Sequence, residues 1–192
     1  MSHRPRLEEI FESHAELVRV VKSTVMDSIE KSGEMLISTL DNGGTIFIAG
    51  NGGSAADAQH FAAELVGRFF IKTRRPLPGI ALTVDTSALT AISNDYGYHQ
   101  LFSRQLEGLA RAGDAFVGIT AGGRSANILA AMETSHKMGL TCIGLVGGDP
   151  SAVAPYCSQV VSIPHTETAR VQEMHITVIH GWCDMIDRHF GA

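Results

Sequence analysis

The sequence predicts an α/β fold: a doubly wound, five-stranded parallel sheet flanked by helices, with an N-terminal helical arm. Short apolar runs rich in β-branched residues alternate with stretches of helical period, as expected for strands buried on both faces. Several of these runs end in glycine-rich turns that lead into the next helix. A chain of 192 residues suits one domain, which we expect to comprise a helical region (1–41) and an α/β core (42–192).

Local patterns predict each element in chain order. Apolar residues recur at helical spacing over 5–41, where neither Gly nor Pro intervenes between Pro5 and Gly33. This region either forms an oligomerisation arm or packs on its own sheet. Asp41-Asn42-Gly43-Gly44 predicts a stop and a turn. Strands are then expected at 45–49, 80–83, 115–119, 141–146 and 159–163, and helices at 55–66, 125–138 and about 166–189.

Composition excludes several classes of protein. The net charge is −5, with 18% charged and 44% hydrophobic residues, which is too apolar for a disordered chain. No basic cluster is present to contact phosphates, so we expect no nucleic-acid partner. No run of about 18 apolar residues occurs, so no membrane span is expected. The polar N-terminus lacks the apolar core of a signal peptide, which predicts a cytoplasmic protein.

The cysteines suggest no special chemistry. Cys142, Cys157 and Cys183 are odd in number, lie far apart and form no CxxC motif. A disulfide framework and a cysteine metal site are therefore not expected. We expect these three residues to be ordinary and mostly buried.

Two glycine-rich turns follow predicted strands. The first is Gly50-Asn51-Gly52-Gly53-Ser54 and the second is Thr120-Ala121-Gly122-Gly123-Arg124-Ser125. Open α/β sheets bind ligands at the carboxyl ends of their strands, and a helix N-terminus attracts anions. Turns of this kind are also common without any ligand. Neither is a Walker loop or a complete GxGxxG motif, so together they favour a small phosphorylated ligand over a dinucleotide.

Two groups of polar residues could bind a metal or act as acids and bases. His60 and Glu64 are four residues apart on one helix face, a spacing that suits two ligands of one divalent metal, a base beside an acid, or a plain surface pair. The apolar neighbours of this pair indicate a largely buried helix. The C-terminal helix carries Gln172, Glu173, His175 and His180. Gln172 and His180 are separated by about 12 Å of rise, which makes it difficult for one helix to hold one ion through both, and a symmetric assembly that paired these helices would ease this.

Other polar residues have weaker signals. His175 is expected to be a satisfied core or surface histidine. Asn94-Asp95-Tyr96-Gly97-Tyr98 is polar and turn-like, and either contacts a substrate or is only a turn.

The motifs taken together resemble the sugar isomerase (SIS) domain family, whose fold is flavodoxin-like. The resemblance rests on residues 49–65, 89–97, 101–105 and 170–180, and it extends over nearly the whole chain. Within this family the chain is similar to enzymes that convert sedoheptulose 7-phosphate to D-glycero-D-manno-heptose 7-phosphate. That reaction is the first step toward nucleotide-activated heptose for bacterial surface glycans.

The resemblance implies a homotetramer with active sites between subunits, a small phosphorylated sugar as partner, and one zinc ion per site. Family metal ligands correspond to His60, Glu64, Gln172 and His180. Family substrate contacts correspond to Asn51, Gly52, Gly53, Ser54, Glu64, Asn94, Asp95, Thr120, Ser125 and Gln172, with Ala121 and Gly122 as backbone contacts only.

The chain departs from the family pattern in its second turn, where Gly122 stands at a position that is usually serine. One hydroxyl donor is therefore missing, and a hydrogen bond to a charged group is worth roughly 1.5–3 kcal/mol. Arg124 either compensates or points to solvent.

Moving a carbonyl between C1 and C2 requires proton transfer through an enediol. Our mechanistic hypothesis makes Glu64 the base at carbon and His180 the residue that moves protons at oxygen, while a metal polarises the carbonyl. Two alternatives remain open: an enzyme for a different phosphosugar, or a non-catalytic SIS module that senses phosphosugars or binds a replication initiator. The presence of both Glu64 and His180 favours the enzyme.

Overall fold

A computed structural model describes residues 2–191 of the chain. In chain order the elements are α1 (Arg4–Thr24), α2 (Met26–Asp41), β1 (Ile46–Gly50), α3 (Gly53–Val66), β2 (Gly79–Ala81), α4 (Thr86–Tyr96), the 3₁₀ helix η1 (Tyr98–Gln100), α5 (Ser103–Leu109), β3 (Ala115–Thr120), α6 (Ala126–Lys137), β4 (Thr141–Gly147), the 3₁₀ helix η2 (Ala154–Tyr156), β5 (Gln159–Ile163) and α7 (Thr168–Phe190).

The five strands form one parallel sheet in the order β2-β1-β3-β4-β5, which confirms the predicted fold class. The strand order reverses between β1 and β3, and open α/β sheets bind ligands in the crevice at such a point. Gly50 and Ile119 are partners at the ends of these two strands. The two glycine-rich turns are therefore neighbours in space.

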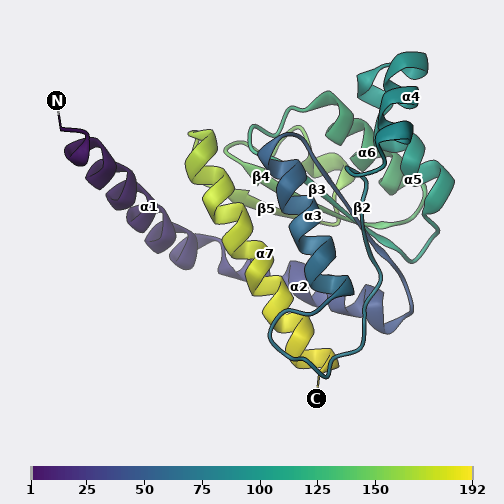
Figure 1. The fold of residues 1–192 in the computed structure, drawn as a ribbon, viewed down its shortest axis with the longest axis horizontal. Coiled ribbons are helices and arrows are strands. Elements are labelled where there is room, and N and C mark those ends of the chain that lie inside the picture. Colours follow the sequence, from purple (N-terminus) through teal and green to yellow (C-terminus); the bar gives the residue numbers. More distant parts are fainter. Residues whose placement is uncertain (1, 192) are drawn as a thin grey trace.

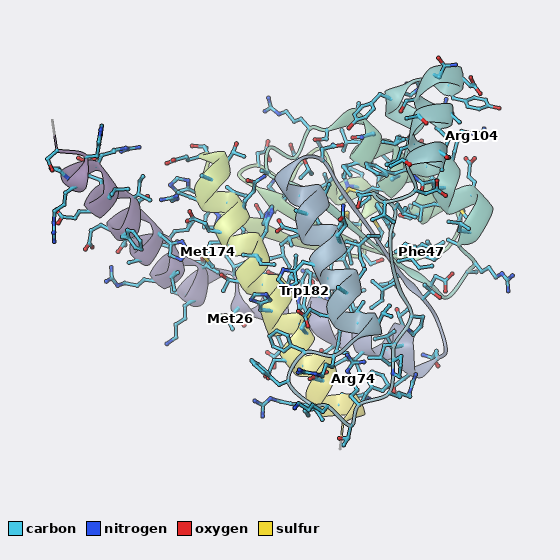
Figure 2. All side chains as sticks on the ribbon, in the orientation of Figure 1. Met26, Phe47, Arg74, Arg104, Met174 and Trp182 are labelled. Atoms are coloured by element: carbon cyan, nitrogen blue, oxygen red, sulfur yellow. The ribbon has the colours of Figure 1, made fainter. Side chains whose placement is uncertain are left out.

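Helices cover both faces of the sheet because successive strand residues point in opposite directions. On β1, Ile46 and Ile48 join a core with α2, α3 and α7, whereas Phe47 and Ala49 join a core with α5 and α6. In Figure 1, α3 and α7 lie side by side and run in the same direction. The fully buried Trp182 joins α7 to α2, since its indole N–H donates to the carbonyl of Ile29 (2.9 Å; Figure 2).

Four helices begin at the same edge of the sheet. α3, α4, α6 and α7 each follow a strand, namely β1, β2, β3 and β5, and all the strands are parallel. Their N-termini therefore gather at the carboxyl edge, where the two glycine-rich turns also lie.

The helical region over 5–41 is present but broken. α1 ends at Thr24, and Val25 separates it from α2 with φ −119° and ψ −11°. The hydroxyls of Ser23 and Thr24 both donate to the carbonyl of Val20, and such bonds bend helices. The N-terminal part of α1 extends away from the body of the molecule (Figure 1), whereas Leu17 and Val21 near its other end are buried in the core.

Two further helices, α4 and α5, had no counterpart among the expected elements. The prediction of a turn at Asn94-Asp95-Tyr96 is wrong, because these residues form the last turn of α4, and Gly97 ends that helix with φ +87°. No residue of α4 is fully buried, and only Leu89 and Ile92 pack against the core, so its apolar stripe is short.

The three cysteines are mostly buried, as expected. Cys142 and Cys183 are buried, Cys157 is half-buried, and all three are free thiols. Among residues 2–191, no helix has the length and apolar character needed to cross a membrane.

Candidate functional site

The first turn is shaped by glycine at two positions. A Cβ on Gly50 would lie 2.3 Å from the carbonyl oxygen of Ser54, so only glycine allows the chain to fold back there. Gly52 has φ +56° and caps α3. Gly53 begins the helix, and Ser54 is buried one residue later. These four residues bring the backbone to the N-terminus of α3 without side chains in the way, as an anion site requires.

The Asn51 side chain is held by a polar network. Asn51 and Asn127 exchange two amide hydrogen bonds of 2.9 Å, and the hydroxyl of Tyr98 donates to Oδ1 of Asn51 (2.8 Å). Asn127 is buried at the start of α6 and joins the first turn to the second. The sequence patterns did not indicate Asn127, and they indicated Tyr98 only as part of the stretch 94–98, because the role of both depends on the spatial adjacency of the two turns.

In the second turn, the hydroxyls of Thr120 and Ser125 lie 3.0 Å apart. Gly123 turns the chain with φ +65°. Gly122 is exposed, and a Cβ on it would meet nothing within 4 Å. The turn therefore has two hydroxyls in mutual contact and open space where a serine side chain would fit.

A pocket of about 410 Å³ opens beside the first turn. It lies at the carboxyl ends of β1 and β2 and is bordered by α4 and η1. The residues that line it are Gly50, Asn51, Gly52, Ala55, Thr83, Leu89, Thr90, Ser93, Tyr98, Leu101 and Phe102. Oγ1 of Thr83 is buried and makes no hydrogen bond, so it is available to a ligand here.

Asn94 and Asp95 lie near this pocket but do not line it. Both are exposed in the last turn of α4, where the Asn94 amide donates to the Asp95 carboxylate (2.8 Å). Within one chain they are therefore not brought together with the glycine-rich turns.

Three of the four expected metal ligands meet between α3 and α7. Nε2 of His60 lies 3.2 Å from Oε1 of Glu64, which is the expected one-turn pairing. Nε2 of His180 lies 3.4 Å from Nε2 of His60, and the two rings meet edge to face at 5.0 Å. The Glu64 side chain is 23% exposed and that of His60 43%, so this face of α3 is more open than its apolar neighbours indicated.

Gln172, the fourth expected ligand, lies elsewhere. A Cβ on Gly53 would lie 2.8 Å from Nε2 of Gln172, so this amide packs against the first turn. Gln172 and His180 both belong to α7, where their separation of eight residues makes about two helical turns. Within residues 2–191, no three His, Cys, Asp or Glu side chains are already arranged to hold one metal ion. The donors that do meet, two imidazoles and a carboxylate, are of the type that zinc prefers.

Asp57 belongs to the same face of α3, one turn before His60, and was also missed. Burial raises the pKa of Asp57 to about 6, against the opposite effect of the nearby His60. Its Oδ2 is buried and makes no hydrogen bond. The i, i+3 spacing to His60 was the signal that could have revealed it.

Other histidines have structural surroundings. His175 is fully buried, which agrees with a core histidine, and it interacts with the backbone of Val146 without a hydrogen bond of good geometry at either ring nitrogen. Burial lowers its pKa to about 4. His14 pairs with Glu173 at 2.8 Å, which places α1 against α7.

The fold and these turns define a class of protein: a parallel α/β domain that presents helix N-termini to a phosphorylated ligand. Residues 9–147 match the model of the SIS domain family. The phosphoheptose isomerase of Aliarcobacter butzleri is 48% identical over 92% of this chain and 93% of that protein. The phosphoheptose isomerase of Nitratiruptor is 54% identical over 80% of this chain and 82% of its own length.

Solved structures agree. The phosphoheptose isomerase of Neisseria gonorrhoeae is 40% identical, with a TM-score of 0.91 over 97% of this chain and 100% of that chain. That of Francisella tularensis is 34% identical, with a TM-score of 0.93 over 98% and 100%. The chain belongs to the SIS domain family and, within it, to the phosphoheptose isomerases.

Proposed function

We propose that this protein is an aldose–ketose isomerase that converts sedoheptulose 7-phosphate to D-glycero-D-manno-heptose 7-phosphate. This reaction would supply the first step of nucleotide-activated heptose synthesis for bacterial surface glycans, in the cytoplasm. The observation that carries the proposal is the meeting of Glu64, His60 and His180 in a chain that matches phosphoheptose isomerases over nearly its full length.

Glu64 is assigned the proton transfer between C1 and C2, and His180 the proton movement at the two oxygens. A carboxylate is basic enough to take a proton from a carbon next to a carbonyl when the enediol is stabilised. An imidazole can give a proton to one oxygen and accept one from the other near neutral pH. Glu64 and His180 both lie next to His60, which supports their action on the carbon and oxygen atoms of one substrate.

The glycine-rich turns are assigned to phosphate and sugar recognition. Backbone N–H groups of Asn51, Gly52, Gly53 and Ser54, and the hydroxyls of Thr120 and Ser125, would donate to phosphate oxygens. Ala121 and Gly122 would contribute backbone only. Asn94, Asp95 and Gln172 are assigned to the sugar hydroxyls.

Zinc is part of the proposal. His60, Glu64, Gln172 and His180 would hold one ion, which would act as a Lewis acid on the sugar carbonyl. The donor types suit zinc, and because Gln172 lies against Gly53 in one chain, we propose that the full set is completed when copies of the chain assemble.

The proposal also includes a homotetramer with active sites between subunits. Glu64 lies ten residues beyond Ser54, about 15 Å along α3, which is longer than an extended seven-carbon sugar phosphate. A phosphate on the first turn of one chain would therefore be served by the acid–base pair of another. Exposed apolar side chains on α1, Leu7 (54%) and Phe11 (73%), support such contacts.

The test is turnover of sedoheptulose 7-phosphate followed by NMR, with protein stripped of metal by a chelator and then supplied with zinc. Aldose phosphate that appears only after zinc is added supports the isomerase and the metal site together. His60→Gln should bind zinc at least tenfold more weakly, while the exposed His136→Gln serves as the matched control. Tight binding of the sugar phosphate without product under either condition would favour the non-catalytic SIS module instead.

A further inference from the structure

His180 has a second aromatic neighbour, which the sequence patterns did not indicate. The ring of Phe69 lies 5.5 Å from that of His180, with the two planes tilted by 33°. His60 contacts the same imidazole at 5.0 Å. The imidazole of His180 therefore contacts two rings, of which that of Phe69 has no donor or acceptor atoms.

Phe69 belongs to the segment 67–78, which joins α3 to β2 without regular secondary structure. Its ring is half-buried and packs against the core that α3 and α7 share. The ring of the next residue, Phe70, lies 4.1 Å from that of Phe69, with the two planes tilted by 54°, but Phe70 is 69% exposed. Of these two adjacent rings, Phe69 is the one that reaches His180.

A buried carboxylate fixes this segment directly behind Phe69. Asp187 accepts hydrogen bonds from the backbone N–H groups of Phe70 (2.6 Å) and Ile71 (2.7 Å). It also pairs with Nε of Arg74 (2.5 Å), and both side chains of this pair are only 1% exposed. Asp187 is two helical turns beyond His180 on α7, so one helix carries the imidazole and anchors the segment that packs on it.

Arg74 connects the same segment to Glu64. Its guanidinium donates to the carbonyl oxygens of Leu65 (2.9 Å) and Glu64 (2.6 Å) in the last turn of α3. Figure 2 shows Arg74 beside the C-terminal half of α7. The Asp187–Arg74 pair therefore fixes the backbone at Glu64, the segment that carries Phe69, and the helix of His180 relative to one another.

We propose that Phe69 is a positioning residue for His180. Its ring, fixed by the Asp187–Arg74 pair, occupies the space into which the imidazole would otherwise rotate and keeps Nε2 of His180 directed at Nε2 of His60. Misplacement of a reacting group by about 1 Å can cost on the order of a hundredfold in rate. The inference rests on the role proposed above for His180.

The experiment compares Phe69→Leu, Phe69→Tyr, Phe70→Leu and His180→Gln by kcat, KM, zinc affinity and thermal melting. Phe69→Leu should lower kcat about tenfold or more, with KM changed less than about twofold. It should also weaken zinc binding about tenfold in competition with a chromogenic chelator. Phe69→Tyr keeps a ring and should restore kcat. Phe70→Leu removes a ring of equal size from the same segment and should match the original protein.

The outcomes separate this inference from the proposed function. Full turnover in His180→Gln would contradict the role assigned to His180. Loss of turnover in His180→Gln together with unchanged kcat in Phe69→Leu would overturn the positioning role alone. Equal losses in Phe69→Leu and Phe70→Leu, or a loss in Phe69→Leu that Phe69→Tyr does not restore, would also overturn it, because either would indicate only a structural contribution of the segment.

Discussion

The Nε2 atoms of His60 and His180 lie 3.4 Å apart, although 120 residues separate them in the chain. The contact exists because α3 and α7 pack side by side on one face of the sheet (Figure 1). Glu64 is one turn further along α3, at 3.2 Å from the same nitrogen of His60. A single helix pairing therefore brings together the residues proposed as the base, as the group that moves protons at oxygen and as a metal ligand.

Replacing the Glu64 carboxylate tests its assignment as the base. Glu64→Gln keeps the shape and part of the hydrogen bonding but cannot accept a proton, so kcat should fall by about 10²–10⁴-fold. Thermal melting should change little, because the side chain is partly exposed. Glu133→Gln, which removes an exposed carboxylate paired with Lys137, is the control and should keep full turnover. Substantial residual activity in Glu64→Gln would remove Glu64 from the mechanism.

Gly122→Ser tests the missing hydroxyl of the second turn. Open space surrounds Gly122 and its φ is not positive, so serine should fit without strain. If the hydroxyl reaches the phosphate, KM for sedoheptulose 7-phosphate should fall by about tenfold. Gly123→Ser is the contrasting variant, since φ +65° makes any side chain costly there by about 1 kcal/mol. An unchanged KM in a folded Gly122→Ser protein would place the phosphate away from this position.

Asp187→Ala should destabilise the protein by about 3–5 kcal/mol, because it leaves the Arg74 guanidinium buried without a partner. Urea unfolding at one protein concentration measures this loss. Asp184→Ala removes an exposed partner of Arg188 on the same helix and should cost less than about 1 kcal/mol. A small effect of Asp187→Ala would show that the pair is not needed to hold segment 67–78.

The same carboxylate predicts acid sensitivity. Burial alone would raise the pKa of Asp187, but hydrogen bonds from Ile71, Arg74 and Phe70 outweigh it and hold the pKa below its ordinary value of 3.8. A lowered pKa in the folded state stabilises the fold above about pH 4, and this contribution disappears as the pH falls further. Asp187→Asn should flatten the stability profile in that acidic range.

His175 should affect the stability of the fold in a different pH range. Its folded pKa of about 4 lies below the ordinary 6.5, so the unfolded chain takes up a proton first as the pH falls. Stability should therefore decline between about pH 6.5 and pH 4, with a loss on the order of 2 kcal/mol at pH 5. His175→Leu should remove that part of the decline, whereas the exposed His136→Gln should not. Parallel pH profiles for all three proteins would contradict the assignment.

The sheet could be predicted from sequence because each strand is a short apolar run that ends near glycine or a turn. Such a run is stable as a strand of a parallel sheet that helices cover on both faces. α4 could not be predicted in the same way, since none of its residues is fully buried and Asn94-Asp95-Tyr96-Gly97 marks its end rather than a loop. The break at Val25 was missed because it depends on hydroxyls, not on Gly or Pro.

The candidate site was partly accessible to the same reasoning. The pairing of His60 with Glu64 follows from helical spacing, and the two turns follow from strand ends. The His60–His180 contact and the Asp187–Arg74 pair join residues more than 100 positions apart, so only the packing of α7 reveals them. Gln172 was expected with the metal ligands, and in one chain it lies against Gly53 instead.

The gathering of four helix N-termini at one edge of the sheet has a consequence for how a sugar phosphate arrives. The protein as a whole carries a charge of −5 and repels a dianion at a distance, whereas the helix dipoles attract it only within the first turn of each helix. At physiological salt, screening over about 8 Å removes much of the long-range repulsion and leaves the short-range attraction largely intact. Moderate ionic strength should therefore speed substrate capture, and the edge of the sheet is where an approaching anion first meets a favourable field.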